Sequence, residues 1–129
     1  MAESPREWFI QAEYDLDTAR AMFDSGRNVY AVYMCHLSME KALKGLYQEK
    51  YEKIPPKTHD LRYLLEKIGL RPSETQEKFL IRLNSAGVTT RYPEELSKLF
   101  KIYPEDIVRD YLASTKELVA WAAQQLRTP

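Results

Sequence analysis

The segment from Asn28 to Lys50, NVYAVYMCHLSMEKALKGLYQEK, decides the fold of this chain. It contains no proline, and its only glycine lies near its end. Apolar residues recur within it at the three- and four-residue spacing of one helical face, which predicts a long α-helix. The first turns are apolar on their other sides too, so we expect a central helix covered on more than one face. The main apolar face comprises Ala31, Val32, Cys35, Met39, Ala42, Leu43 and Leu46.

A polar edge follows this helix. His36 and Glu40 are spaced i, i+4, and Lys44 lies one further turn along. His36 and Glu40 could supply two metal ligands, but nothing nearby completes a set of four, and the second histidine, His59, falls on a different element. We therefore predict no metal and no cofactor. The sequence favours a histidine bonded to a neighbouring helix and a Glu40 paired with Lys44 or with an arginine.

The composition is that of an ordinary globular chain. The 129 residues suggest one domain spanning 1–129. Lys and Arg number 19, as do Asp and Glu, so no net charge attracts nucleic acid or a membrane. The one cysteine excludes a disulfide within the chain and is expected to be buried. The polar start resembles no signal peptide and no apolar run is long enough to span a membrane, so we expect a cytoplasmic protein.

Capping residues and prolines divide the chain into helices without any strand-like alternation. A tight turn after the first helix makes it antiparallel to the second. The sequence thus predicts an all-α protein, an antiparallel four- to five-helix up-and-down bundle. The first two expected helices cover 5–25 and 28–50. The third begins after a Thr58 cap and ends at Gly69, and the fourth runs from Ser73 to near Gly87. One or two helical turns are expected over 94–100, and a last helix has Pro104 at its first position.

The start of the central helix carries more apolar surface than one subunit needs. We therefore expect a homodimer in which helix faces of two subunits meet. The alternative is that the fourth and fifth helices cover this surface within one subunit. The residues concerned are Tyr30, Tyr33, Met34 and Leu37.

The segment Thr89-Thr90-Arg91-Tyr92-Pro93 is the second candidate for function. Tyr92 precedes a proline and should be extended, so we expect Arg91 and Tyr92 to be presented from a loop. An arginine beside an aromatic ring can hold a phosphate and stack a base. Alternatively, Tyr92 closes the end of the bundle and Arg91 pairs with an acid such as Glu94.

Four motifs in order resemble those of HEPN-domain proteins. The run from His36 to Leu46 resembles the family signature H-x-x-x-EKALK. An opening helix with Ala12 to Leu16 and Ala19 precedes it, and Thr58-His59-Asp60-Leu61 and then Arg91-Tyr92-Pro93 follow it. The similarity covers nearly the whole chain, which resembles a minimal, stand-alone HEPN protein.

This resemblance implies a bundle of four or five helices that usually forms a symmetric dimer. Many members of the family act with a small nucleotidyltransferase partner as toxin–antitoxin pairs. Several branches are metal-independent RNases, in which an R-x(4–6)-H motif places an arginine and a histidine at the dimer interface. The histidine would handle a proton and the arginine would stabilise the phosphate.

The chain departs from that motif. Counting from Arg91, the histidine should fall at Leu96, Ser97 or Lys98. Whether it is an enzyme is thus uncertain, and the sequence favours a non-catalytic or degenerate HEPN module that binds a nucleotide, a nucleic acid or a nucleotidyltransferase partner as a dimer. The alternatives are an RNase that uses Arg91 with a non-histidine base, for which Tyr92 or Glu94 are candidates, and a purely structural dimer. The expected ligand-binding residues are Arg91, Tyr92, His36, Glu40 and Lys44, and Arg91 and Tyr92 are the catalytic candidates.

Overall fold

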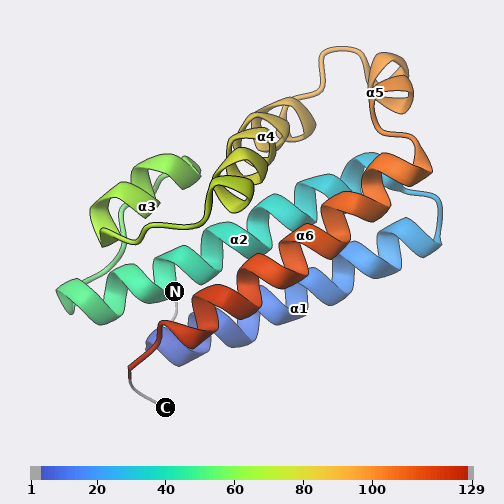
Figure 1. Cartoon of the computed structure of the whole chain (residues 1–129). Coiled ribbons are helices and arrows are strands. Elements are labelled where there is room, and N and C mark those ends of the chain that lie inside the picture. The colour runs from blue at the N-terminus through green and yellow to red at the C-terminus, as the bar shows by residue number, and fades with distance from the viewer. Residues whose placement is uncertain (1–3, 128–129) are drawn as a thin grey trace.

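The computed structural model describes residues 4–127, and these form six helices and no strand (Figure 1). This confirms the all-α prediction. The helices are α1 (Pro5–Asp24), α2 (Asn28–Tyr51), α3 (Leu61–Ile68), α4 (Glu74–Arg91), α5 (Leu96–Ile102) and α6 (Glu105–Gln124).

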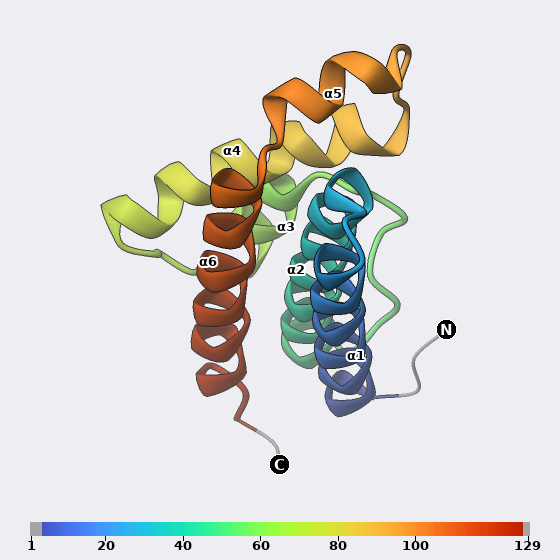
Figure 2. The same ribbon diagram turned by 90° about the vertical axis from the view of Figure 1, so that its right-hand side faces the viewer.

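Three long helices lie side by side as the body of the fold. Ser4 caps α1 by accepting a hydrogen bond from the Glu7 N–H at 3.2 Å, and Pro5 occupies the first turn, where its missing N–H costs nothing. Gly26 adopts a φ of 76° in the short turn that follows, and this reverses the chain into α2. Figure 2 shows α1, α2 and α6 as adjacent columns, with α4 and α5 across the top of this view. Figure 1 shows that α3, α4 and α5 follow one another along the length of α2.

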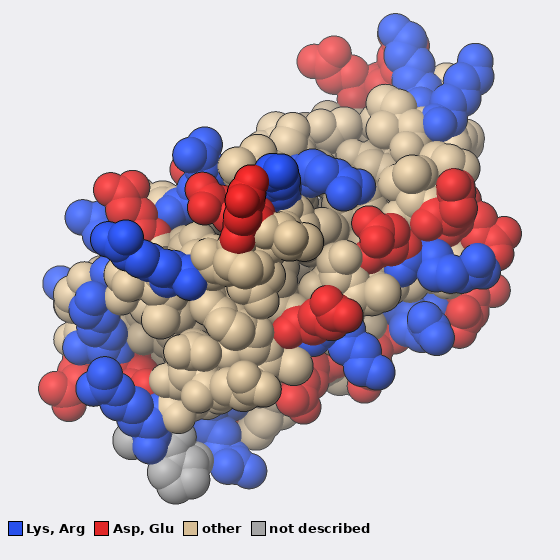
Figure 3. All heavy atoms as spheres, in the orientation of Figure 1, with Lys and Arg blue, Asp and Glu red and all other residues tan. Residues whose placement is uncertain are grey.

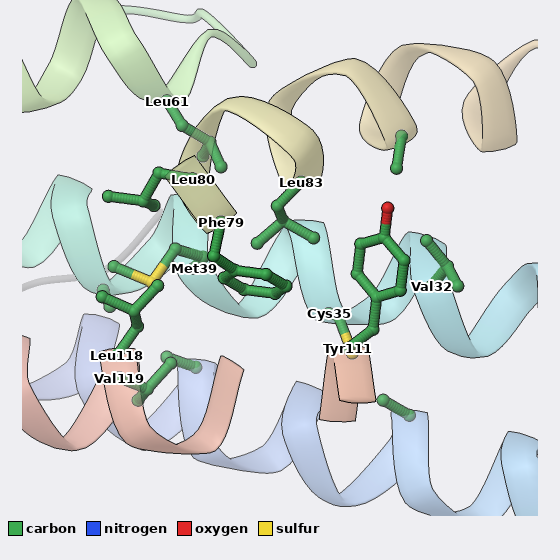
Figure 4. Close-up of a cluster of buried hydrophobic side chains, with 14 of the residues drawn as sticks. Val32, Cys35, Met39, Leu61, Phe79, Leu80, Leu83, Tyr111, Leu118 and Val119 are labelled. Carbon is green, nitrogen blue, oxygen red and sulfur yellow. The ribbon is translucent and has the colours of Figure 1, made fainter. Parts of the chain in front are cut away.

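The second helix is the centre of the molecule. It contacts each of the other five helices. Figure 4 shows Val32, Cys35 and Met39 of α2 facing side chains from α4 and α6. Burying one such aliphatic or aromatic side chain contributes about 1.5–3 kcal/mol, so this cluster holds the helices together. Its labelled members are Val32, Cys35, Met39, Leu61, Phe79, Leu80, Leu83, Tyr111, Leu118 and Val119.

Two helix boundaries differ from those expected. α4 continues through Gly87 and ends at Arg91, so Arg91 is helical rather than presented from a loop. The helix passes through Gly87 and ends only before Pro93, whose ring cannot continue it. Within this last turn the Thr90 hydroxyl donates a hydrogen bond to the carbonyl of Ala86 at 2.8 Å.

The cap of α3 is Asp60 rather than Thr58. The Asp60 carboxylate accepts from the N–H groups of Arg62 and Tyr63, whereas the Thr58 hydroxyl accepts from the N–H of Asp60 itself. The turns expected over 94–100 form two residues later as α5, and Pro104 is the N-cap of α6 rather than its first residue.

The surface at the start of α2 is only partly covered. Tyr30 is 49% exposed, while Tyr33, Met34 and Leu37 are half-buried. The guanidinium of Arg91, from α4, lies over the Tyr33 ring. Side chains of both charge signs are interspersed over the face shown in Figure 3. Among the described residues, no helix combines the length and apolar character that crossing a membrane requires.

Candidate functional site

A buried carboxylate, that of Glu40, is the centre of a polar cluster between α2, α4 and the loop before α3. Its side chain is only 5% exposed. Lys44 donates to Glu40 Oε2 at 2.9 Å, and His59 Nδ1 lies 2.9 Å from Oε1. Arg91 Nη2 and His36 Nδ1 approach the same oxygen at 3.9 and 4.0 Å. One acid is thus surrounded by four basic side chains, which offsets the cost of its burial.

Local sequence explains three of the five residues of this cluster. His36, Glu40 and Lys44 are spaced four residues apart on α2 and therefore lie on one face, one turn above another. All three are buried, with 8% exposure at most. This face is turned towards α4 and the loop before α3, which supply Arg91 and His59.

Arg91 reaches the cluster from the last residue of α4. Its guanidinium carbon lies 4.8 Å from the centroid of the Tyr33 ring, and Nη1 donates to the Tyr33 hydroxyl at 3.3 Å. The side chain is 16% exposed, and within residues 4–127 its Nη2 has no hydrogen-bond partner. Arg91 is thus held in place by the aromatic ring, while one of its donor nitrogens is buried without a hydrogen-bond partner within the described residues.

His36 is buried with both ring nitrogens unsatisfied. The residue is 1% exposed, and neither nitrogen finds a hydrogen-bond partner in the described part of the chain. Burial lowers the pKa of His36 below its ordinary 6.5 and outweighs the Glu40 carboxylate, which raises it, while the electrostatic influence of Arg91 and His59 lowers it further. The ring is therefore neutral at pH 7, with one N–H donor and one acceptor nitrogen.

Gly87 allows α4 to approach α2 closely enough to form the site. A Cβ atom at this position would lie 2.5 Å from His36 Nε2 and closer still to two ring carbons. Real Cβ contacts are essentially never shorter than 3.0 Å. Only glycine therefore lets the helix backbone pass over the imidazole.

These residues enclose a cavity of about 220 Å³. Asn84 fixes one wall, since its Oδ1 accepts from the Leu61 N–H at 2.9 Å and its Nδ2 donates to Asp60 at 3.1 Å. Tyr92, 69% exposed, stands at the rim. Pockets for whole small molecules span about 300–1,000 Å³, so this cavity suits a single chemical group of a ligand. It is lined by His36, His59, Asp60, Asn84, Gly87, Val88, Arg91 and Tyr92.

The structure brings the five expected ligand-binding residues into one region. His36, Arg91 and Tyr92 line the cavity, while Glu40 and Lys44 lie behind it as a charge pair. The expected pairing of Glu40 with Lys44 is present, and Arg91 approaches Glu40 rather than Glu94.

Sequence reasoning missed three residues of the site: His59, Asp60 and Asn84. The motif Thr58-His59-Asp60-Leu61 was the available signal, but it gave no spatial link to α2. Within residues 4–127, no group of three His, Cys, Asp or Glu side chains is arranged to hold a metal ion.

Comparison with known proteins identifies the family. The model of the HEPN domain matches residues 5–126, so the chain belongs to the HEPN domain family. The fold is similar to the crystal structure of ST0689, an archaeal HEPN homologue, with a TM-score of 0.77 and 23% identity over 96% of this chain and 98% of that one. It is also similar to the crystal structure of TT1696 from Thermus thermophilus, with a TM-score of 0.79 and 20% identity over 95% and 98% of the two chains. No curated protein matches the chain with significant sequence similarity.

Proposed function

We propose that this HEPN protein binds a phosphate group of a nucleotide or of RNA in the cavity between His36 and Arg91. The proposal rests on buried polar atoms of cavity-lining side chains that have no hydrogen-bond partner. Arg91 Nη2 and both ring nitrogens of His36 lack partners within residues 4–127, and both side chains line the cavity. Unsatisfied buried donors cost about 1–3 kcal/mol each, so a ligand that satisfies them gains that free energy on binding.

Arg91 is the group of the site that favours an anion, because Oδ1 of the Asp60 carboxylate in the lining already accepts hydrogen bonds from the helix start and from Asn84. Glu40 is already paired with Lys44 at 2.9 Å, so its charge only partly compensates Arg91, whose Nη2 is 3.9 Å away. A phosphate offers oxygen acceptors for Arg91 and for the N–H of His36, and a protonated phosphate oxygen can donate to the other nitrogen of His36. Tyr92, exposed at the rim, is positioned to stack on a base attached to that phosphate.

We also propose that the protein acts as a homodimer. Val88 and Tyr92, 65% and 69% exposed, line both the cavity and a neighbouring groove of about 420 Å³ that Ile102 of α5 also lines. Exposed apolar side chains grouped in this way are typical of a protein interface. A second copy that covered this groove would lie directly beside Arg91. Sedimentation at micromolar concentration tests the dimer, and a monomer there would contradict it.

Isothermal titration calorimetry with inorganic phosphate, adenosine 5′-monophosphate and a short single-stranded RNA tests the binding site. A hydrogen bond between charged groups is worth about 1.5–3 kcal/mol, so Arg91→Ala should weaken binding roughly 10- to 100-fold. Arg109→Ala is the matched control, because Arg109 is an exposed arginine of α6 that pairs with its neighbour Glu105, lies over the Phe23 ring and does not line the cavity. Equal affinities for the wild type and Arg91→Ala would refute the assignment.

The family resemblance is the support for a nucleotidyltransferase partner. We propose such a partner as a second ligand of the dimer, to be tested by co-purification with the product of a neighbouring nucleotidyltransferase gene. A pair that does not co-elute would remove this proposal and leave the phosphate site unaffected.

A further inference from the structure

The buried imidazole of His36 places a hydrogen-bond acceptor at the wall of the cavity. Burial lowers its pKa and keeps the ring uncharged at pH 7, so one nitrogen carries a proton and the other a lone pair. Nδ1 is the nitrogen that approaches the Glu40 carboxylate, 4.0 Å from Oε1, and the negative charge there favours the proton on Nδ1. Nε2 is then the acceptor. It lies beside Gly87, which also lines the cavity, since a Cβ at Gly87 would be 2.5 Å from it.

Two atoms of the lining ask for opposite hydrogen-bonding partners. His36 Nε2 is buried without a partner within residues 4–127, and as an acceptor it requires a donor. Arg91 Nη2 is buried without a partner too, and as a donor it requires an acceptor. The cavity of about 220 Å³ suits one chemical group, so that group must both donate and accept hydrogen bonds.

The charges of the lining favour a group with one negative charge over a group with two. Arg91 brings a positive charge, whereas the positive charge of Lys44 is taken up by Glu40 at 2.9 Å. The Asp60 carboxylate also lines the cavity and repels a second negative charge. Besides Asp60, the groups around the imidazole are Glu40 of α2, Arg91 and the neutral Asn84 of α4, and His59 of the loop before α3.

We propose that the cavity selects a terminal phosphate monoester, that of a mononucleotide or of an RNA end, and binds it in the singly protonated, monoanionic form. This rests on the phosphate-binding function proposed above and narrows it to one class of ligand. The P–OH group donates to His36 Nε2, and a charged oxygen accepts from Arg91. A phosphodiester within an RNA chain has no P–OH group, so it leaves His36 Nε2 unpaired.

A preference for the protonated phosphate makes binding depend on pH. The second pKa of a phosphate monoester is about 6, so the dianion predominates at pH 7 and above. Binding of the monoanion then takes up one proton, and the affinity for a monoester should fall about tenfold for each pH unit between pH 7 and 8.5. A diester has no proton to gain in this range, so its affinity should change little.

Isothermal titration calorimetry with matched forms of one short single-stranded RNA tests the preference. The forms carry a 5′-phosphate, a 3′-phosphate or hydroxyl groups at both ends, while their internal diesters are identical. Adenosine 5′-monophosphate and adenosine form the corresponding mononucleotide pair. At least one phosphorylated end should bind about 10-fold or more tightly than the hydroxyl form, which is the effect of leaving one buried acceptor unpaired. The 5′ and 3′ forms and the mononucleotide show which source of the monoester fits.

Two variants locate the proton. His59→Gln removes the other imidazole of the lining but keeps an amide that can face Glu40, so the fall in affinity between pH 7 and 8.5 should persist. His36→Leu removes the acceptor, so the phosphorylated and hydroxyl forms should bind alike. Melting temperatures show whether each variant is folded, and the pH profiles of wild type and His59→Gln decide the question if His36→Leu is not.

The outcomes separate this inference from the function on which it rests. Equal affinities of wild type for all three RNA forms, pH-independent binding of adenosine 5′-monophosphate, or loss of the pH dependence in His59→Gln would overturn the inference and leave the phosphate site standing. Adenosine that binds as tightly as its 5′-monophosphate, or a wild type that binds no phosphate-containing ligand, would overturn the proposed function as well.

Discussion

Gly87→Ala probes the close approach of α4 to α2 on which the site depends. The added methyl group would lie 2.5 Å from His36 Nε2 and closer still to the ring carbons Cδ2 and Cγ, against an ordinary van der Waals distance of at least 3.4 Å, so one side must move by more than about 0.9 Å (3.4 − 2.5). The His36 ring is 1% exposed, so it cannot relieve the conflict by turning out into solvent. Overpacking of this kind costs about 1–3 kcal/mol.

A second effect of the same substitution acts in the opposite direction. Alanine in a helix interior is favoured over glycine by about 1 kcal/mol. We therefore expect a net loss of up to about 2 kcal/mol, which corresponds to a decrease in Tm of up to roughly 8 °C for a domain of this size. Thermal unfolding followed by circular dichroism measures it, and titration with inorganic phosphate should show weaker binding because the imidazole is displaced.

Gly45→Ala is the comparison for this experiment. A Cβ at Gly45 would lie 2.9 Å from Phe9 Cε2 and 3.1 Å from the carbonyl oxygen of Pro5, a milder conflict, and Gly45 does not line the cavity. It should leave phosphate binding unchanged. A Gly87→Ala variant that is as stable as wild type and binds phosphate equally would refute the tight packing of α4 on His36.

Three further predictions concern the buried groups. The pKa of His36 is lowered in the folded state, so on acidification the unfolded chain protonates this imidazole before the folded protein does. The contribution of the neutral imidazole to stability is therefore fully present above pH 6.5 and is lost as the pH falls below that value, by at most about 1.4 kcal/mol per pH unit. His36→Gln should flatten this pH dependence of the free energy of unfolding, measured by urea titrations at about pH 5 to 8. Burial raises the pKa of the Cys35 thiol to about 12, so a disulfide reagent at pH 8 should label it only after denaturant is added; rapid labelling of the native protein would contradict its burial. Phe9→Ala should reduce the free energy of unfolding by about 3–5 kcal/mol in chemical denaturation, because Phe9 is 5% exposed between α1 and α2, and a loss below 1 kcal/mol would argue against that packing.

The order of the helices could be predicted from the sequence because each rests on local signals. The capping box at Ser73, the Ser4-Pro5 start of α1 and the periodicity of α2 all act within a few residues. The helix end expected near Gly87 was wrong for the same reason, because a glycine considered only with its sequence neighbours indicates the end of a helix. Here it accommodates the ring of a residue 51 positions earlier in the chain, His36, and no local pattern contains that contact.

The site could be predicted only in part. The i, i+4 spacing of His36, Glu40 and Lys44 was sufficient to place them on one face. The contact between His59 and Glu40 joins a loop to a helix across 19 residues, and that between Arg91 and Tyr33 spans 58. Both depend on how α4 and the loop before α3 pack along the side of α2. The place of His59 in the site therefore became visible only once the fold was known.

Nuclear magnetic resonance of the two imidazole rings tests the phosphate cavity most directly. The chain has only two histidines, so long-range proton–nitrogen correlations give two sets of ring signals, and the His59→Asn variant assigns them. Titration with adenosine 5′-monophosphate should shift the signals of both His36 and His59, because both rings line the cavity. Ring signals that stay unchanged at saturating nucleotide would contradict the site.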